Sequence, residues 1–480
     1  MDKEIKNIID IFKQLNTVPR RSKHETEISR WLIDKAASLN LDSKADNMGN
    51  VVIKVPASPG REDAPLIVLQ GHMDMVCEKI AGSSHDFSKD PIEVIEDGDW
   101  MSAKDTSLGA DNGIAIAYCL ALAERRDIPH PPLELLFTVD EETGLNGAKN
   151  LSQDFIRGKI LVNLDSEEEG VFTIGCAGGR DTNLVYEPET SAVADNSCGL
   201  SITVGGLKGG HSGSEIHLHR ANAIKLLARL LSRIFSDVDA RLVSINGGSA
   251  KNAIPRDAKA VIAVSRDNEK KIIELVDAMA ASCRSEYSET EESLEFNVST
   301  APLNGAAAYT GDFARNLIAL LRIVPTGARE HSAQIPGLVE TSSNLAIVQD
   351  KDGKLEVATS QRSSSESALE EISGDVEIAG TLTGARVGYQ NAYPAWQPDT
   401  SSAILNRCKD VYFRLFSKEP KVEVIHAGLE CAVIGSIYDG MEMISVGPTI
   451  VQPHSPDERL YLPSVETTWK FLLALLESFK

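Results

Sequence analysis

The sequence lacks the cysteine pattern of a disulfide framework or of a thiolate metal site. Its seven cysteines include no Cys-x-x-Cys pair, and their number is odd. We expect them to be free, buried thiols. No stretch approaches the ~20 apolar residues that span a bilayer, and the first residues do not show the apolar run of an export signal. The expectation is therefore a cytoplasmic protein.

Basic residues are also scarce relative to acidic ones. Lysine and arginine total 48 against 70 aspartates and glutamates, which gives a net charge of −22. Such a surface repels phosphate backbones and anionic headgroups, so nucleic-acid and membrane partners are not expected. The hydrophobic share of 42% and the charged share of 25% are those of a globular protein. A chain of 480 residues predicts two or more domains.

The beginning and the end of the chain share one style of patterning. Helix-like patterns alternate with short apolar runs that read as strands. The helical patterns lie at 3–14, 25–39, 113–126, 400–416 and 465–479, and the strand-like runs at 66–69, 133–139, 160–164, 422–425 and 443–446. This alternation predicts an α/β domain with a mostly parallel central sheet and helices on both faces.

The middle of the chain reads as a separate α+β domain. Strand-like runs at 200–204 and 258–265 alternate with helical patterns at 219–236 and 268–283, and a related pattern recurs at 310–385. The polar segment 285–292 is interpreted as a solvated loop. The layout predicts an inserted domain at 193–392, with residues 1–192 and 393–480 forming the two parts of the other domain.

Chemically active side chains stand where the predicted strands and helices end. His72 follows the run at 66–69, Glu141 and Glu142 follow the run at 133–139, and Asp165 closes the run at 160–164. Asp111 precedes the helical pattern at 113–126 and can be read as its cap. Each position alone is also compatible with an ordinary polar turn. Together they offer an unusual ligand and acid–base capacity at one edge of a parallel sheet.

This set matches most of the requirements of a dinuclear zinc site. Two zinc ions about 3.5–4 Å apart need a bridging carboxylate with nitrogen and oxygen ligands on either side. Only one histidine is missing. His454, in a loop between two prolines, supplies it if the tail rejoins the first domain; otherwise it is an exposed loop histidine.

Five segments carry a resemblance to a known family. They are GHMDMVCEK (71–79), LGADNG (108–113), DEETG (140–144), NLDSE (163–167) and PHSP (453–456). In this order they resemble the co-catalytic zinc exopeptidases that include aminoacylase, carboxypeptidase G and the carnosinases (family M20). Within that family they are most similar to the aminoacyl-histidine dipeptidase branch, also called peptidase D or Xaa-His dipeptidase. The resemblance spans nearly the whole chain.

The resemblance implies a metal site with two Zn²⁺ ions, for which Co²⁺ or Mn²⁺ can substitute. His72 and Asp165 would bind one ion, Glu142 and His454 the other, and Asp111 would bridge them. It also implies that Asp74 orients the His72 ring, as a carboxylate behind a metal-binding histidine does. Glu141 would be the general base that deprotonates the attacking water.

The inserted domain resembles the lid of this family. His211, within the segment GGHSG (209–213), would stabilise the oxyanion, although a plain glycine turn is the alternative. Asn252 and Arg362 would hold polar groups of the substrate, and arginine suits a carboxylate. The lid also allows a homodimer. No role is assigned to His217, His219 or His426.

The resemblance therefore predicts a cytosolic two-zinc dipeptidase whose partner is a small, unblocked peptide, preferably Xaa-His as in carnosine-like substrates. Two alternatives remain open. One is a sibling aminoacylase or tripeptidase, and the other is a catalytically silent binding protein on the same scaffold. The presence of both Glu141 and Asp111 argues against a silent protein.

Overall fold

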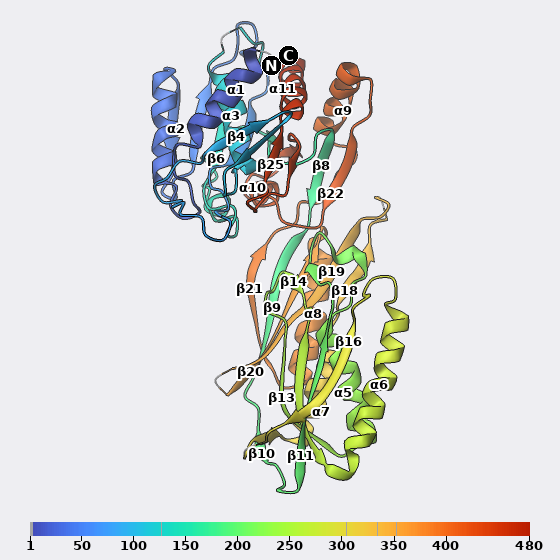
Figure 1. Cartoon of the computed structure of the whole chain (residues 1–480). Helices are drawn as coiled ribbons and strands as arrows, with labels where there is room; N and C mark the ends of the chain where they lie inside the picture. Colours follow the sequence, from blue (N-terminus) through green and yellow to red (C-terminus); the bar gives the residue numbers. More distant parts are fainter. Residues whose placement is uncertain (1–2, 126, 304, 334, 352) are drawn as a thin grey trace. The chain divides into compact units, whose positions relative to one another are not determined.

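The computed structural model describes residues 3–125, 127–303, 305–333, 335–351 and 353–480. The chain forms two compact units, and each is described by itself. The first unit comprises Met1–Cys176, Trp396–Val424 and Leu429–Lys480, and the second comprises Ala177–Ala395 and Ile425–Gly428. Helices α1 (Lys3–Leu15) and α11 (Leu462–Ser478), from opposite ends of the sequence, pack against each other in the first unit (Figure 1).

The first unit is built on a mixed sheet with the strand order β1-β2-β6-β3-β7-β23-β8-β22. Its inner strands β6, β3, β7 and β23 run parallel, and β1, β2 and β8 pair antiparallel at the flanks. The strands are β1 (Asp42–Ala45), β2 (Val51–Val55), β3 (Ile67–His72), β6 (Leu133–Thr138), β7 (Ile160–Asn163), β8 (Val171–Cys176), β22 (Lys421–Ile425) and β23 (Glu442–Ser445). The predicted α/β class with a mostly parallel central sheet is confirmed.

Helices pack on this sheet through their apolar sides. α3 (Ala110–Ala123) contacts β3, and all of its residues are buried. From Ile114 onward its side chains are apolar on every side of the helix, as expected for a fully buried helix. α1 buries one apolar stripe that includes Ile5, Ile8 and Phe12. The other helices of this unit are α2 (Thr26–Ser38), α4 (Asn146–Lys149), α9 (Ala403–Phe416) and α10 (Glu430–Ile437).

A small second sheet in this unit fixes the tail of the chain beside its beginning. Its strand order is β24-β25-β5-β4, so a segment near residue 455 is held next to a segment near residue 100. The strands are β4 (Val94–Asp97), β5 (Trp100–Ala103), β24 (Ile450–Val451) and β25 (Arg459–Tyr461). The loop between β24 and β25 carries His454.

The second unit is an antiparallel sheet with the order β16-β11-β15-β13-β19-β20-β9-β21, and β18 pairs with β19. Its strands are β9 (Gly178–Tyr186), β11 (Ser197–Gly205), β13 (Ala240–Gly247), β15 (Ala258–Ser265), β16 (Glu295–Ala301), β18 (Gly327–His331), β19 (Val339–Lys351), β20 (Lys354–Ser363) and β21 (Arg386–Tyr393). Short strand pairs join β10 (Thr190–Ala192) to β17 (Ala307–Tyr309) and β12 (Gly210–His211) to β14 (Ala253–Ile254).

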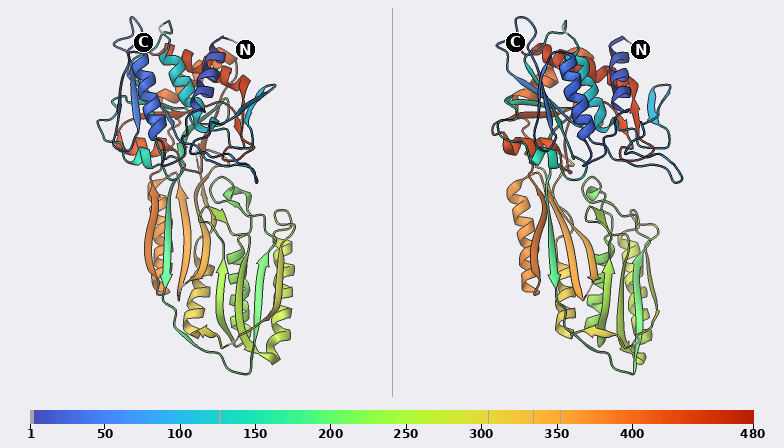
Figure 2. Two further views of the ribbon diagram at one scale, coloured as in Figure 1. Left: turned by 60° about the vertical axis from the view of Figure 1, so that its left-hand side comes forward. Right: turned by 90° about the vertical axis from the view of Figure 1, so that its left-hand side faces the viewer.

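Helices of the second unit share one apolar core with its sheet. α5 packs against β11, β13 and β15, and α8 packs against β9, β20 and β21 (Figure 2). The helices are α5 (Ala223–Asp237), α6 (Glu269–Glu286), α7 (Gly311–Ile323) and α8 (Glu366–Leu382), with single 3-10 turns at Ile216–Leu218 and Arg266–Asn268.

The interpretation of segment 285–292 as a solvated loop is wrong in part. α6 extends to Glu286, and Glu291 is only 2% exposed. Its carboxylate accepts the backbone N–H groups of Lys208 and Ala221 at 2.8 and 3.0 Å. Burial of this charge is compensated because both of its oxygens are hydrogen-bonded.

The seven cysteines are free thiols, of which Cys77 and Cys198 are half-buried and the others buried. Burial raises the pKa of the Cys77 thiol to about 11. Among the helices that the structure describes, none combines the length and the apolar character required to cross a bilayer.

Candidate metal centre

The predicted site residues of the first unit emerge from one edge of the sheet. β3 and β6 are parallel and in register, with His72 opposite Thr138, and β7 flanks β3 on its other side. The last residue of β3 is His72, and Glu141 and Glu142 follow β6 after two residues. Asp165 follows β7 after one residue. Parallel strands thus bring these side chains together, as the sequence predicts.

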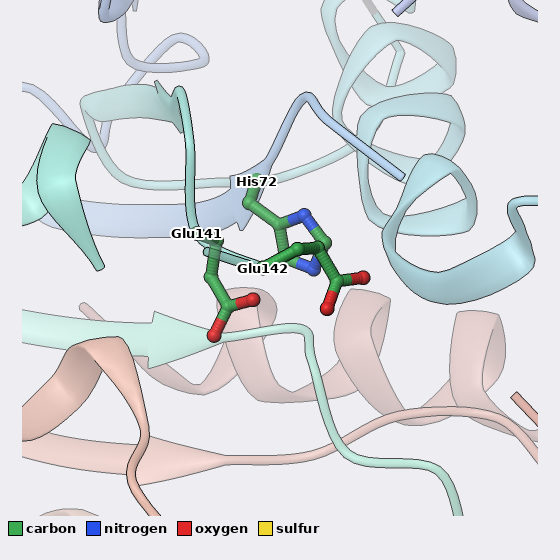
Figure 3. A group of neighbouring side chains, drawn as sticks. All are labelled: His72, Glu141 and Glu142. Atoms are coloured by element: carbon green, nitrogen blue, oxygen red, sulfur yellow. The ribbon is translucent and has the colours of Figure 1, made fainter. Parts of the chain in front are cut away.

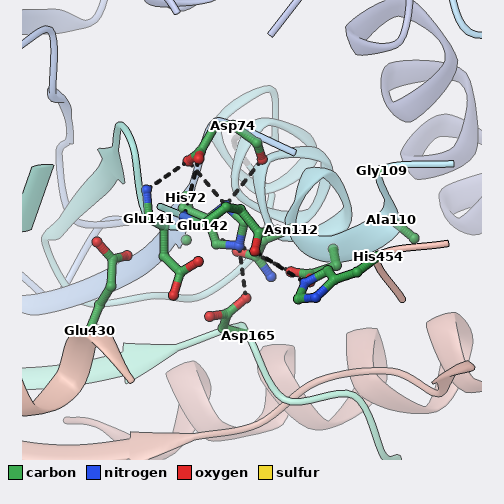
Figure 4. A network of polar contacts seen from close by, with 12 residues as sticks. His72, Asp74, Gly109, Ala110, Asn112, Glu141, Glu142, Asp165, Glu430 and His454 are labelled. Atoms are coloured by element: carbon green, nitrogen blue, oxygen red, sulfur yellow. Dashed lines mark hydrogen bonds and ion pairs between the residues drawn. The ribbon is translucent and has the colours of Figure 1, made fainter. Parts of the chain in front are cut away.

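Asp111 lies between the two histidines. His72 Nε2 is 3.0 Å from Asp111 Oδ1, and His454 Nε2 is 2.9 Å from Asp111 Oδ2. His72 Nε2 is also 3.4 Å from Asp165 Oδ1, and His454 Nε2 is 3.1 Å from Glu142 Oε2. Two donor groups result, His72–Asp111–Asp165 and Asp111–Glu142–His454, and the ligand atoms of each lie within 4.8 Å of one another. Figure 4 shows His72, Glu142, Asp165 and His454 gathered in this cluster.

The donor set fits a pair of divalent cations. The side chains of Glu142 and Asp165 are 6% and 7% exposed, yet Glu142 Oε1 has no hydrogen-bond partner among the described residues and Asp165 Oδ1 has only the 3.4 Å approach of His72 Nε2. Buried carboxylates without donors are costly, and cations relieve that cost. Imidazole nitrogens with carboxylate oxygens are a ligand set that zinc accepts.

Glu141 and Glu142 leave the same loop in different directions, with their carboxylates on different sides of the His72 ring (Figure 3). Burial raises the pKa of Glu141 well above its ordinary value. It also raises the pKa of Asp165 to about 6. For Asp111, burial is outweighed by hydrogen bonds from His454 and His72, which hold its pKa below the ordinary value.

The carboxylates of this cluster favour the protonated, positively charged form of its two histidines. Hydrogen bonds to Asp111 and Glu142 raise the pKa of His454 to about 11. Burial would lower the pKa of His72, but Asp165 and Asp111 raise it well above the ordinary value. The cluster therefore attracts positive charge strongly.

Asp74 holds more than the His72 ring. His72 Nδ1 is 3.4 Å from Asp74 Oδ1 and 3.1 Å from the backbone oxygen of Asp74. The Asp74 carboxylate also accepts the N–H groups of Glu141 and Glu142, at 3.0 and 3.2 Å, and the Ser22 hydroxyl at 2.8 Å. This buried carboxylate thus ties the loop after β3 to the loop after β6.

Three further buried residues were missed by the sequence analysis. Asn112 accepts the His72 backbone N–H at 3.1 Å and donates to Leu164 O at 2.8 Å. Glu430 Oε2 accepts from Gln70 and Thr138. Glu458 binds the turn that carries Asp111. Asn112 lies in the segment 108–113 that carries the family resemblance, whereas no pattern in the sequence marks Glu430 or Glu458.

His211, Asn252 and Arg362 belong to the second unit, whereas the cluster around Asp111 belongs to the first. His211 Nδ1 accepts the N–H groups of Gly213 and Ser214 at 3.2 and 3.1 Å, and burial lowers its pKa. Asn252 and His211 line a cavity of about 550 Å³ within this unit. Arg362 Nη1 donates to the Tyr393 hydroxyl at 2.7 Å.

No role was assigned to His426 from its sequence pattern, and it belongs to the second unit. Its Nε2 lies 2.7 Å from Ser342 Oγ. Burial, reinforced by the charges of Arg362 and His211, lowers the pKa of His426 to about 3. The ring is therefore neutral, and Arg362 is the permanent positive charge of this group.

Known proteins share the fold and the sequence over nearly the full length. A cytosol non-specific dipeptidase from Escherichia coli is 39% identical over 468 residues, which cover 98% of this chain and 96% of the relative. The aminoacylhistidine dipeptidase from Vibrio alginolyticus, whose crystal structure is known, is 38% identical in sequence. The two structures superpose with a TM-score of 0.91, and the match covers 99% of this chain and 96% of that chain. The aminopeptidase PepT from Bacillus cereus shares the fold at 16% identity and a TM-score of 0.57, with coverage of 98% of each chain.

The sequence model of peptidase family M20/M25/M40 matches residues 68–478, a range that contains every residue of the cluster around Asp111. The resemblance noted from the sequence is thus confirmed. This chain belongs to peptidase family M20/M25/M40, and it is a metallopeptidase that hydrolyses peptide bonds.

Proposed function

We propose that this chain is a cytoplasmic dipeptidase with two zinc ions, which cleaves unblocked dipeptides and prefers Xaa-His substrates of the carnosine type. The position of Asp111 between His72 Nε2, at 3.0 Å, and His454 Nε2, at 2.9 Å, is the observation that supports it most. A carboxylate placed in this way can bridge two cations. The names of the relatives from Escherichia coli and Vibrio alginolyticus, a cytosol non-specific dipeptidase and an aminoacylhistidine dipeptidase, support the substrate class.

In this proposal His72 and Asp165 would hold one zinc ion, Glu142 and His454 would hold the other, and Asp111 would be the bridging carboxylate. Co²⁺ or Mn²⁺ can replace zinc. Bound at this site, the metal pair supplies a lowered pKa for water and polarisation of the peptide carbonyl. Asp74 holds the His72 ring and the backbone of the loop that bears Glu141 and Glu142.

Glu141 is proposed as the general base and acid. Its raised pKa suits a group that takes a proton from water and later passes it to the leaving amine. Because its carboxylate diverges from that of Glu142, one glutamate can remain free while its neighbour binds metal (Figure 3).

Residues 193–392 are proposed as a lid that completes the substrate site. His211 would donate to the oxyanion, and Asn252 would hold a polar group of the peptide. The guanidinium of Arg362 would pair with the C-terminal carboxylate that every unblocked dipeptide carries. A homodimer through the lid is supported by two exposed apolar side chains of α8, Ile378 and Leu382, which are 60% and 79% exposed.

The variant Glu141→Ala tests the proposed mechanism. We expect kcat to fall by about 10²–10⁴-fold, the usual contribution of a general base, while the zinc content stays near that of the wild type. Glu168→Ala is the matched control, because Glu168 is an exposed carboxylate just beyond β7. Loss of zinc from Glu141→Ala would make Glu141 a ligand, and unchanged turnover would remove it from the mechanism.

The substrate class is tested by side-by-side hydrolysis of carnosine, other Xaa-His dipeptides, tripeptides and N-acetyl amino acids with added zinc. We expect the Xaa-His dipeptides to be cleaved with the highest kcat/KM. Faster cleavage of N-acetyl amino acids or tripeptides would assign the sibling activities instead. A chain that binds zinc and cleaves none of them would be a silent binding protein.

A further inference from the structure

The turn that presents Asp111 is bound by a single carboxylate from the far end of the sequence. Glu458 Oε2 accepts the N–H groups of Leu108 and Gly109 at 2.8 and 2.9 Å, and Oε1 accepts those of Ala110 and Asp111 at 2.7 and 3.2 Å. Glu458 is only 2% exposed. Buried N–H groups must be paired, and no side chain near Gly109 caps this turn locally. Glu458 therefore supplies what the local sequence does not.

A buried guanidinium holds the same turn through its carbonyl side. Arg20 Nη2 donates to Gly109 O at 2.6 Å, and Arg20 Nη1 lies 3.2 Å from Met73 O and 3.3 Å from Asp74 O. Arg20 is 2% exposed. Its planar fork thus joins the turn at 108–111 to the loop that follows His72.

Glycine is required where Arg20 reaches the turn. Gly109 has φ of +70°, a conformation that side chains disfavour. A Cβ at this position would lie 2.3 Å from Arg20 Nη2 and 2.8 Å from Met75 Sδ. The close approach of the guanidinium is therefore built into the sequence of the turn.

The loop that bears Glu458 also bears His454. Glu458 N donates to Ser455 O at 3.1 Å, which closes a turn between the two side chains. His454 has φ of +59°, an uncommon conformation for a residue other than glycine, so contacts elsewhere must hold this loop in place. Two side chains of this one loop therefore contact Asp111: the His454 ring lies beside its carboxylate, and the Glu458 carboxylate accepts its backbone N–H.

We propose that Arg20 and Glu458 are positioning residues that clamp the turn at 108–111 and thereby set the place of Asp111 between His72 and His454. This inference rests on the proposed dinuclear centre. Glu458 accepts the backbone N–H of Asp111, and Arg20 donates to the backbone oxygen of Gly109, so both act on the backbone of the turn. Together they hold the Asp111 carboxylate in place before any ion is bound.

Glu458→Gln tests the clamp with little change of shape. The amide oxygen still accepts two N–H groups, but the amide NH₂ faces the other two donors, so the turn must shift. Zinc affinity is measured on metal-free protein by competition with a chelating dye, with circular dichroism to confirm folding. We expect the affinity for at least one ion of the pair to fall by about 10–100-fold, as when partners behind metal ligands are lost.

Glu134→Gln is the matched control in the same unit. Glu134 is also 2% exposed, and its Oε2 accepts the N–H groups of Arg157 and Gly158 at 2.7 and 3.0 Å. It lies near the start of β6, whereas Glu141 and Glu142 follow the end of that strand. We expect Glu134→Gln to lower thermal stability and to leave zinc affinity at the wild-type value.

Arg20→Lys is the second variant, because lysine keeps the charge but cannot bond both loops with a planar fork. Arg20→Lys should lower the zinc affinity by a similar factor. At saturating zinc it should also lower kcat, with little change in KM. Wild-type zinc affinity in a folded Glu458→Gln or Arg20→Lys protein would overturn the inference. So would a failure of both variants to fold while Glu134→Gln folds, since the pair would then serve the fold alone. If the wild type itself binds no pair of ions, the proposed function fails first.

Discussion

Glu430 gives the sharpest prediction about pH and stability. It is the first residue of α10 and is fully buried. Its Oε2 accepts from Gln70 Nε2 at 2.5 Å and Thr138 Oγ1 at 2.6 Å, and its Oε1 has no hydrogen-bond partner among the described residues. Burial raises the pKa of this carboxyl to about 7 from an ordinary value of 4.5, and the charge of His72 offsets only part of the rise. The perturbation is Glu430→Gln, which imitates the protonated acid.

The magnitude follows from the two pKa values. A rise from 4.5 to about 7 corresponds to about 3 kcal/mol, since one unit is worth about 1.4 kcal/mol. Between these pH values the folded chain keeps a proton that the unfolded chain has lost. Raising the pH through this window therefore destabilises the wild type, and the loss is complete above the folded-state pKa. The free energy of unfolding of Glu430→Gln, relative to the wild type, should grow by about 3 kcal/mol between pH 4.5 and 8.

Urea unfolding of metal-free protein, followed by tryptophan fluorescence, measures this difference. All four tryptophans, at positions 31, 100, 396 and 469, lie in the same unit as Glu430, so the signal reports on that unit. Thr138→Val removes a hydrogen bond that lowers the pKa of Glu430, and it should move the pH-dependent loss to higher pH. An equal stability difference between Glu430→Gln and wild type at pH 5 and pH 8 would refute the reasoning.

Three further predictions concern metal, backbone and substrate. Removal of metal by a chelator should lower Tm, measured by calorimetry. Adding zinc at about one hundred times its Kd should then raise the free energy of unfolding by about 2.7 kcal/mol. An unchanged Tm would contradict the metal centre. Gly447→Ala should cost about 1–3 kcal/mol in urea titrations, because its Cβ would lie 1.7 Å from Ser166 O; wild-type stability would mean that this backbone yields freely. Arg362→Lys should raise KM for dipeptides about tenfold through loss of a charge-assisted hydrogen bond, with kcat nearly unchanged, and an unaltered KM would separate Arg362 from the substrate carboxylate.

Much of the first unit could be predicted because its signals are local. The apolar runs at 66–69, 133–139 and 160–164 became β3, β6 and β7, since a strand buried on both faces requires continuous apolar side chains. Because the carboxyl ends of parallel strands lie at the same edge of a sheet, His72, Glu142 and Asp165 could be expected to lie together. The regular part of α3 begins after Asn112, as the pattern indicated, because Asp111 and Asn112 have non-helical dihedral angles.

Other parts of the site carry no local signal. Glu458 and Glu430 look like ordinary surface glutamates in the sequence, and Glu291 lies in a run that looks solvated. Each is buried because distant donors satisfy it, and those donors are peptide N–H groups or side chains contributed by remote segments. Period and composition describe a residue's near neighbours along the chain, so they cannot reveal such partners.

By itself the sequence determined the class of the fold, the strand-end placement of the acidic and imidazole groups, and the family, because these follow from short patterns of apolar and polar residues. Only the tertiary structure decided that the loop between β24 and β25 reaches Asp111, and that Arg20 and Glu458 hold the turn from opposite sides. The physical reason is chain connectivity. Bringing together segments that are hundreds of residues apart costs conformational entropy, which burial of the whole core offsets, so no local pattern in the sequence reveals these hydrogen bonds.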